Sequence, residues 1–219
     1  MPTKWIEDGG LTDLRWGAEI GANNIAALMV LAAIAHHADD QIGIARITYH
    51  ELEVITSLSR AKIAGGLDTL ENLKIIHRKA HGKSTYALCN YDPSGGWGKL
   101  PAKGLYSAGR ISAFGEFHLR RRTELDALKF YFLFVARRDR HTNLVHLSYD
   151  KIEEYSGIDR NRIKSGVSLL AANGLVYVEH LPSNLSEFGV SNAYRLPHID
   201  PYNHMGTRGR GMDLNEVFS

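Results

Sequence analysis

Hydrophobic residues recur at helical spacing in two stretches of the chain that lie 100 positions apart. They stand at positions 52, 58, 63, 67 and 70 in the first stretch and at 152, 158, 163, 167 and 170 in the second. Residues 48–76 align with 148–176 without a gap, and this spacing gives each stretch one buried helical face. Six positions are also identical: Tyr49/Tyr149, Glu53/Glu153, Arg60/Arg160, Ile63/Ile163, Gly66/Gly166 and Leu70/Leu170. Two copies are too few for a solenoid, so the pattern predicts a duplicated domain.

Polar residues at the ends of these stretches predict where the helices begin. Thr48 and Glu51 have the spacing of a capping box, which predicts a short helix near 49–55, and Ser148 predicts its counterpart near 149–155. The sequences "TSLS" and "SGID" then break the helix, and Ser59 and Asp159 are suitable N-caps for a second one. Each copy therefore predicts a helix-turn-helix.

The segments on either side of each helix-turn-helix are repeated as well. The stretches "NNIAALMVLAAIAHHAD" and "TELDALKFYFLFVARRD" predict apolar helices, each followed by a turn and a short strand, "IARI" or "LVHL". After the second helix, "LKIIHRKAHGKSTYALC" and "GLVYVEHLPSNLSEFGVSNAYRL" both predict strand, turn and strand. The predicted fold class is α+β and mostly α, with the order helix, strand, helix, helix, strand, strand occurring twice.

This order of elements resembles the winged helix-turn-helix superfamily of DNA-binding domains, and "LSYDKIEEYSGIDRNRIKSGVSLLAANGLVYVEH" is the better copy. Two such units in one chain of this size are similar to bacterial and phage regulators and to plasmid replication initiators. The resemblance covers roughly 24–90 and 124–198 and implies two tandem winged-helix domains. The predicted division is a first domain at 1–92, a linker at 93–118, a second domain at 119–198 and a flexible tail at 199–219.

In a helix-turn-helix the second helix enters the major groove, and its N-terminal residues meet base edges. The predicted DNA contacts of the first copy are Ser59, Arg60 and Lys62 in the helix and Arg78, Lys79 and Lys83 in the wing. Those of the second copy are Arg160, Asn161, Arg162, Lys164, Ser165 and Ser168. Because Arg can contact guanine and Asn can contact adenine, the second copy is the better suited to base contacts.

The two copies differ enough that their roles stay open. The first wing is basic and suits phosphate contact, whereas the second contains Glu179 and Glu187. Both units could bind DNA through different elements, or one could bind DNA while the other forms a dimer. Gly65 and Gly66 in the first copy could allow close approach to a DNA backbone or close packing of another helix.

Two arginine clusters flank the second apolar helix. Arg120, Arg121 and Arg122 lie just before the helix. Arg137, Arg138 and Arg140 follow it, about four turns further along the chain. Either cluster could neutralise phosphates or simply form a solvated helix end. Cations are favoured at a helix C-terminus and disfavoured at an N-terminus, so the cluster at 120–122 requires another partner.

Amino-acid composition limits the classes of protein that are expected but does not select one function. The net charge of +2 gives no whole-chain argument for nucleic acid. A single cysteine, Cys89, cannot form an internal disulfide, and the N-terminus has no apolar signal core, so a cytoplasmic protein is expected. The most apolar run, 25–35, is too short to span a bilayer. No metal site, cofactor or catalytic residue is expected, and the spacing of His36 and Asp40 is attributed to a polar helix end.

The sequence thus predicts a non-enzymatic, sequence-specific double-stranded DNA-binding protein. Its expected role is transcription regulation for a plasmid, phage or other mobile element. A DNA replication initiator that binds origin repeats is the first alternative. A winged-helix protein-interaction module that does not bind DNA is the second. A homodimer is left open.

Overall fold

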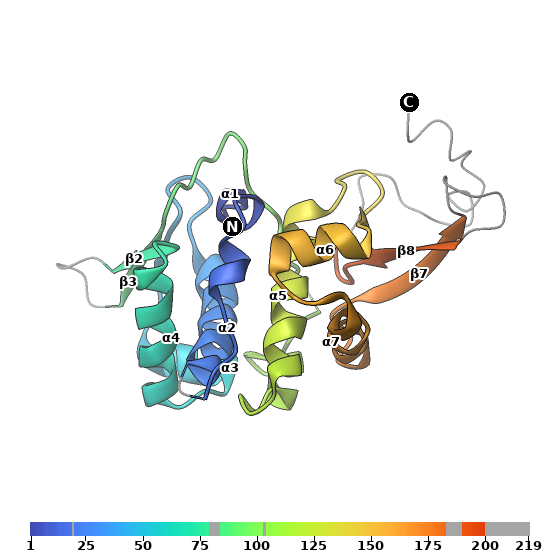
Figure 1. Cartoon of the computed structure of the whole chain (residues 1–219). Helices are drawn as coiled ribbons and strands as arrows, with labels where there is room; N and C mark the ends of the chain where they lie inside the picture. Colours follow the sequence, from blue (N-terminus) through green and yellow to red (C-terminus); the bar gives the residue numbers. More distant parts are fainter. Residues whose placement is uncertain (19, 79–83, 103, 183–189, 200–219) are drawn as a thin grey trace.

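A computed structural model of the chain describes residues 1–18, 20–78, 84–102, 104–182 and 190–199. The fold is α+β with helices predominating, as predicted (Figure 1). The first half contains α2 (Gly21–His37), β1 (Ile44–Arg46), α3 (Tyr49–Thr56), α4 (Arg60–Asn72), β2 (Ile76–Arg78) and β3 (Thr85–Leu88). The second contains α5 (Arg122–Arg137), β6 (Leu144–His146), α6 (Tyr149–Ser156), α7 (Arg160–Ala172), β7 (Tyr177–Pro182) and β8 (Val190–Arg195).

The two halves repeat one order of elements at the predicted offset. The strand, the short helix and the longer helix of the second half begin and end 100 positions after those of the first. Each half also has a three-stranded antiparallel sheet, in the order β1-β3-β2 or β6-β8-β7. The pairs Ala45↔Tyr86 and Val145↔Tyr194 occupy equivalent places in the two sheets. Both tyrosines are buried, so the two sheets bury the same kind of side chain at the same register.

Side-chain caps fix most of the predicted helix starts. The Thr48 hydroxyl accepts a hydrogen bond from the Glu51 amide at 3.1 Å, and the Glu51 carboxylate accepts one from the Thr48 amide at 2.6 Å. Ser59 and Ser148 cap α4 and α6 in the same way. Asp159 takes the N-cap position of α7 but makes no capping hydrogen bond. Its carboxylate instead lies 3.3 Å from Nε of Arg162, an ion pair that competes with the cap.

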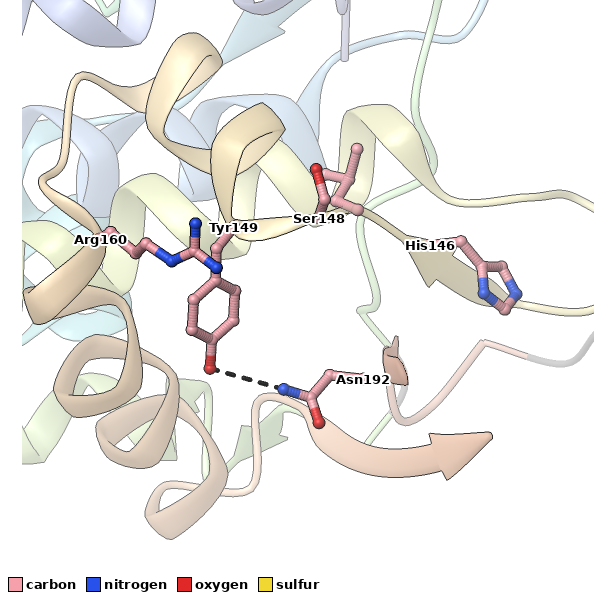
Figure 2. Close-up of a pocket in the computed structure, with 6 residues that line it drawn as sticks. His146, Ser148, Tyr149, Arg160 and Asn192 are labelled. Atoms are coloured by element: carbon pink, nitrogen blue, oxygen red, sulfur yellow. Dashed lines mark hydrogen bonds between the residues drawn. The ribbon is translucent and has the colours of Figure 1, made fainter. Parts of the chain in front are cut away.

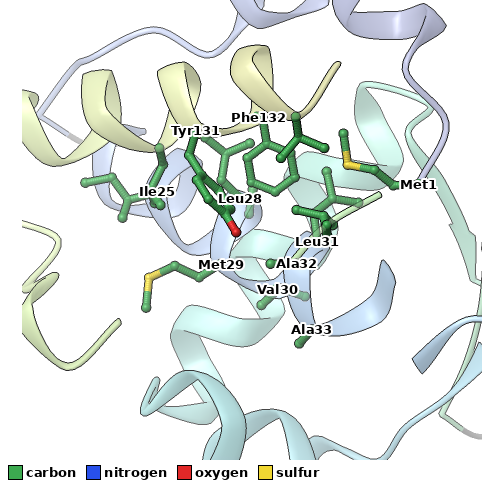
Figure 3. Packing of buried hydrophobic residues seen from close by; sticks show 14 of the residues in the cluster. Met1, Ile25, Leu28, Met29, Val30, Leu31, Ala32, Ala33, Tyr131 and Phe132 are labelled. Carbon is green, nitrogen blue, oxygen red and sulfur yellow. The ribbon is translucent and has the colours of Figure 1, made fainter. Parts of the chain in front are cut away.

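The contact between α2 and α5 joins the two halves. The two helices lie side by side in the centre of Figure 1, with α4 on the outer side of α2 and α7 on the outer side of α5. Figure 3 shows Tyr131 and Phe132 of α5 among Leu28 and Leu31 of α2. The buried residues of both halves belong to one continuous hydrophobic cluster.

Backbone contacts at both ends give α2 and α5 the same direction. Near their N-terminal ends, the Asn24 side-chain amide in the first turn of α2 donates to the Arg15 carbonyl at 2.7 Å, and the Lys129 ammonium in the second turn of α5 donates to the Leu14 carbonyl at 3.1 Å. At their last turns, Gly98 lies against Val135 of α5 and lines one hollow together with His36 of α2. The N-terminal ends of the two central helices therefore meet at one end of the molecule.

Glycine makes the outer helix contact possible in both halves. A Cβ atom at Gly66 would lie 2.9 Å from backbone atoms of Ala26 and Ala27 in α2. A Cβ atom at Gly166 would lie 2.6 Å from the Phe130 ring of α5. Of the two explanations for Gly65 and Gly66, close helix packing is the one that the structure supports, since Gly65 also faces a side chain of α2, that of Asn23.

Residues 93–118 contribute to the shared cluster. This segment contains β4 (Tyr106–Ser107), β5 (Arg110–Ile111) and the 3-10 helix η2 (Ser112–Glu116). It contributes the buried hydrophobic side chains of Leu100, Leu105, Ile111, Phe114 and Phe117. The chain before α2 holds α1 (Lys4–Glu7) and the 3-10 helix η1 (Gly10–Asp13), and the N-terminal amine donates to the Gly98 carbonyl at 2.9 Å. The domain boundaries at 92 and 119 stay a prediction, and the tail at 200–219 lies outside the described residues.

Lys129 is one of the buried charged residues of α5, with Glu124 and Asp126, that the hydrophobic pattern did not predict. It lies in the second turn of α5, is only 4% exposed, and has Asp126 and Arg162 as charged neighbours. Burial lowers the pKa of the Lys129 ammonium from 10.5 to about 8. Holding this charge inside the protein therefore costs folding free energy at neutral pH.

No helix within the described part of the chain has both the length and the apolar character that crossing a membrane requires.

The first prediction concerns the glycine contact. Replacing Gly166→Ala forces a Cβ atom against Phe130 and should lower the free energy of unfolding by about 1–3 kcal/mol. Urea unfolding followed by circular dichroism measures the change. Gly95→Ala is the control because a Cβ atom there would meet nothing within 4 Å. Equal stability of the two variants would contradict the packing described here.

The second prediction concerns Lys129. The unfolded chain keeps this proton to about pH 10.5, whereas the folded chain loses it near pH 8, so unfolding takes up a proton between these values. The contribution of Lys129 to the free energy of unfolding should rise with pH across that window. Lys129→Met should lack the rise and should be more stable than the native protein below pH 8. Parallel pH profiles for the two proteins would show that Lys129 titrates normally.

Candidate nucleic-acid interface

The outer face of α7 presents most of the side chains that the sequence assigned to DNA. Ile163, Val167 and Leu170 are buried against α5, as their spacing predicted. The opposite face exposes Arg160, Asn161, Lys164, Ser165 and Ser168. No acidic residue occurs anywhere in α7, so this face offers hydrogen-bond donors and positive charge without a neighbouring carboxylate of its own helix.

A polar hollow lies beside the start of this face. It has a volume of about 430 Å³ and is lined by His146, Leu147, Ser148, Tyr149, Arg160 and Asn192. Figure 2 shows Arg160 of α7 next to the Tyr149 ring of α6, while Asn192 reaches Tyr149 from β8. The Arg160 guanidinium lies 5.7 Å from the ring centre, and the Asn192 amide donates to the Tyr149 hydroxyl at 3.5 Å. Residues of α7, α6 and β8 thus line one hollow.

Arg160 is held loosely in this hollow. Its side chain is 65% exposed and donates to the Asp150 carboxylate at 2.8 Å. An exposed ion pair of this kind contributes little to stability, so a phosphate can replace the carboxylate at small cost.

Arg162 points the other way, into the protein. Its side chain is 19% exposed, and its Nη1 atom lies 3.6 Å from the buried carboxylate of Asp126 on α5. The pocket that it lines contains Arg15, Arg122, Asp126 and Lys129. Arg162 therefore takes part in a buried charge cluster between α5 and α7 and does not share the outer face with Lys164.

The equivalent face of α4 has a different chemistry. Ala61, Ala64, Gly65 and Asp68 stand where α7 has Asn161, Lys164, Ser165 and Ser168. Arg60 is exposed and pairs with Glu53 at 3.2 Å. Lys62 is half-buried and lines a hollow with Phe114, Phe117 and Arg120. The predicted contacts of the first copy, Ser59, Arg60 and Lys62, therefore gather at the N-terminus of α4 and do not continue along the helix.

In the first half, Arg78 at the end of β2 already has protein partners. Its guanidinium donates to Asp68 at 2.8 Å, and its backbone amide donates to the Glu71 carboxylate at 3.0 Å. This ion pairing lowers the pKa of the Glu71 carboxyl. A phosphate contact by Arg78 would have to displace two carboxylates. Lys79 and Lys83, the other contacts predicted for the first wing, lie outside the described residues.

The sequence did not assign Tyr149 or Asn192 to the site. Tyr149 and Tyr49 form one of the six identical pairs of the repeat, so this identity could have indicated that Tyr149 belongs to the site. Asn192 lies in β8 and aligns with Ser84 through the strand register, and neither position is marked by any pattern in the sequence. Strand pairing alone brings Asn192 to the start of α6.

A scan against protein-family models finds no match to this chain, and a search of curated proteins finds none either. Among the described residues, no three His, Cys, Asp or Glu side chains gather where they could hold a metal ion.

The third prediction separates the two neighbouring arginines. Arg162→Ala leaves the Asp126 carboxylate buried without its partner and should lower the free energy of unfolding by about 3 kcal/mol. Arg160→Ala removes an exposed ion pair and should change it by less than about 1 kcal/mol. Chemical unfolding of both variants tests this contrast, and similar losses would mean that the two side chains have similar environments.

Proposed function

We propose that this chain is a sequence-specific double-stranded DNA-binding protein built from two tandem winged helix-turn-helix units. In this proposal α7 is the helix that enters the major groove, and its outer face contacts base edges. The observation that carries the proposal is the composition of that face: Arg160, Asn161, Lys164, Ser165 and Ser168 are exposed together on a helix that has no acid. Asn and Arg side chains are the types that recognise adenine and guanine edges.

The hollow beside α7 supports the same proposal. Arg160, Tyr149 and Asn192 converge there, and their guanidinium, hydroxyl and amide groups can donate hydrogen bonds to phosphate oxygens. A phosphate bound at this place would fix how deeply α7 enters the groove. The site therefore supplies both base contacts and a backbone contact from three elements of one unit.

The two units have unequal roles in this proposal. Because α4 has small residues and Asp68 on the equivalent face, it offers few groups for base contacts. Base recognition is therefore assigned to the second unit. The cellular role that we propose, regulation of transcription, rests on the resemblance to bacterial and phage regulators.

The fourth prediction tests DNA recognition. Selection from random duplexes should enrich one sequence motif with the native protein. The double variant Arg160→Ala, Lys164→Ala should bind that motif at least about tenfold more weakly, because it loses contacts worth roughly 1–3 kcal/mol each. Fluorescence anisotropy with the enriched duplex and with a scrambled one gives the affinities.

A matched control is available at the other end of the molecule. Lys99→Ala, Arg140→Ala removes the same two charges from exposed positions near Trp97, and should keep the affinity within about twofold of the native value. Failure to enrich any motif would refute the proposal. An equal loss in both double variants would show that net charge, and not α7, governs binding. Several direct repeats in the selected sequence would favour the replication-initiator alternative over the regulator.

A further inference from the structure

Three consecutive arginines occupy the N-terminus of α5, between the two units. Arg120, Arg121 and Arg122, called the arginine strip below, all have exposed side chains. Within the described residues, no carboxylate forms an ion pair with any of the three, although Asp13, Glu116 and Asp159 are the exposed acids of the neighbouring segments. A positively charged strip whose guanidinium groups form no ion pair with a described carboxylate is thus placed at the start of a central helix of the fold.

The backbone beneath the strip is held in place by a buried carboxylate. Glu124 is only 4% exposed and accepts hydrogen bonds from the backbone amides of His118, Arg120 and Arg121, at 2.6, 2.8 and 2.9 Å. Because Glu124 binds the amides and not the guanidinium groups, it fixes the chain while leaving the side chains directed to solvent. This is the local order that a preformed binding surface requires.

The strip is unfavourable in the isolated protein. The N-terminus of a helix carries a partial positive charge, so cations in this first turn are repelled by the helix as well as by one another. The Glu124 carboxylate in the same turn and Asp126 near Arg122 offset only part of this repulsion, since three cations face these two anions. An anionic partner would offset it.

The N-termini of both helix-turn-helix second helices adjoin the strip. On one side Arg120 lines a hollow of about 470 Å³ together with Ser59 and Lys62 at the start of α4. On the other side Arg122 lines a hollow of about 400 Å³ together with Arg15 and with Arg162 at the start of α7. The basic groups therefore continue across the junction of the two halves, from the start of one outer helix to the start of the other.

We propose that the backbone of the bound DNA crosses the arginine strip, so that one duplex contacts both units and the junction between them. This inference rests on the proposed DNA binding and adds the path of the duplex. The phosphates over the strip carry no sequence information; they set the orientation and the register in which α7 meets its bases. In this arrangement the first unit contributes phosphate contacts through Lys62, which accounts for its lack of base-contacting groups on α4.

The fifth prediction concerns the salt dependence of binding. Replacing Arg120, Arg121 and Arg122 together by Ala should weaken binding to enriched and scrambled duplexes by a similar factor, at least about tenfold at 100 mM salt. The slope of log affinity against log salt should become shallower by about 2 to 3, since each lost phosphate contact removes about 0.9. The selected motif should stay the same, because the bases are contacted elsewhere.

Two comparisons make the experiment decisive. The triple Lys variant at the same positions keeps the charge and should retain the salt slope, and thermal unfolding of both variants confirms that Glu124 still holds the segment. Hydroxyl-radical footprinting should show a protected backbone stretch beside the motif that disappears in the triple Ala variant only. If the native protein enriches a motif but the triple Ala variant keeps its slope and footprint, the path across the strip is wrong and the proposed function stands. If the native protein binds no duplex, the proposed function fails and this inference with it.

Discussion

The packing of α2 against α5 is the contact on which the rest of the molecule depends. A single unit of this kind has a small core, and its most apolar helix would expose one face to water if it stood alone. Both central helices are buried on every side, α2 by α4 and α5, and α5 by α2 and α7. The hydrophobic effect therefore acts across the two halves, and burial of apolar area fixes how one half sits on the other. The orientation of the two outer helices follows from this central pair.

The two halves share the features that build the backbone and differ in their outer surfaces. The caps, the glycine at the helix crossing and the buried tyrosine of the middle strand recur in both halves, since each satisfies a geometric requirement of the fold. The residue after the short helix must take the left-handed backbone conformation in both halves: Ser57 has φ of 58° and Gly157 has φ of 64°. The conformational cost is higher for the serine. Only glycine adopts this conformation freely. The outer faces of α4 and α7 carry no such requirement, and there the two copies differ at four aligned positions.

The local elements were predictable from the sequence because they depend on short-range chemistry. The N-caps, the breaks between helices and the period of buried residues placed α3 and α6 within one residue and predicted where α4 and α7 begin. Long-range charge pairing was not predictable. Arg162 was expected among the DNA contacts with Arg160, but Asp126 on another helix draws it inward. Likewise Arg78 was expected to face phosphate, and it folds onto Asp68 and Glu71 of α4. Helical spacing predicts the face of the helix on which a residue lies. It does not predict which carboxylate, distant in sequence, will form an ion pair with that residue.

The charged residues of α5 and its neighbours fall into a buried group and an exposed group, and the two groups have different partners. Inside the protein Asp126 lies between two cations, Arg162 and Lys129, and their attraction offsets only part of the desolvation cost, since burial still lowers the pKa of Lys129. Glu124 is also buried, yet the residues that it binds are backbone amides, which leaves three guanidinium groups outside without a carboxylate among the described residues. Glu124 stands at N3 of α5, and its bonds to the backbone amides stabilise the helix start as in a capping box. The same bonds leave the arginine side chains directed to solvent, so capping of the helix and exposure of the positive strip are compatible in one turn.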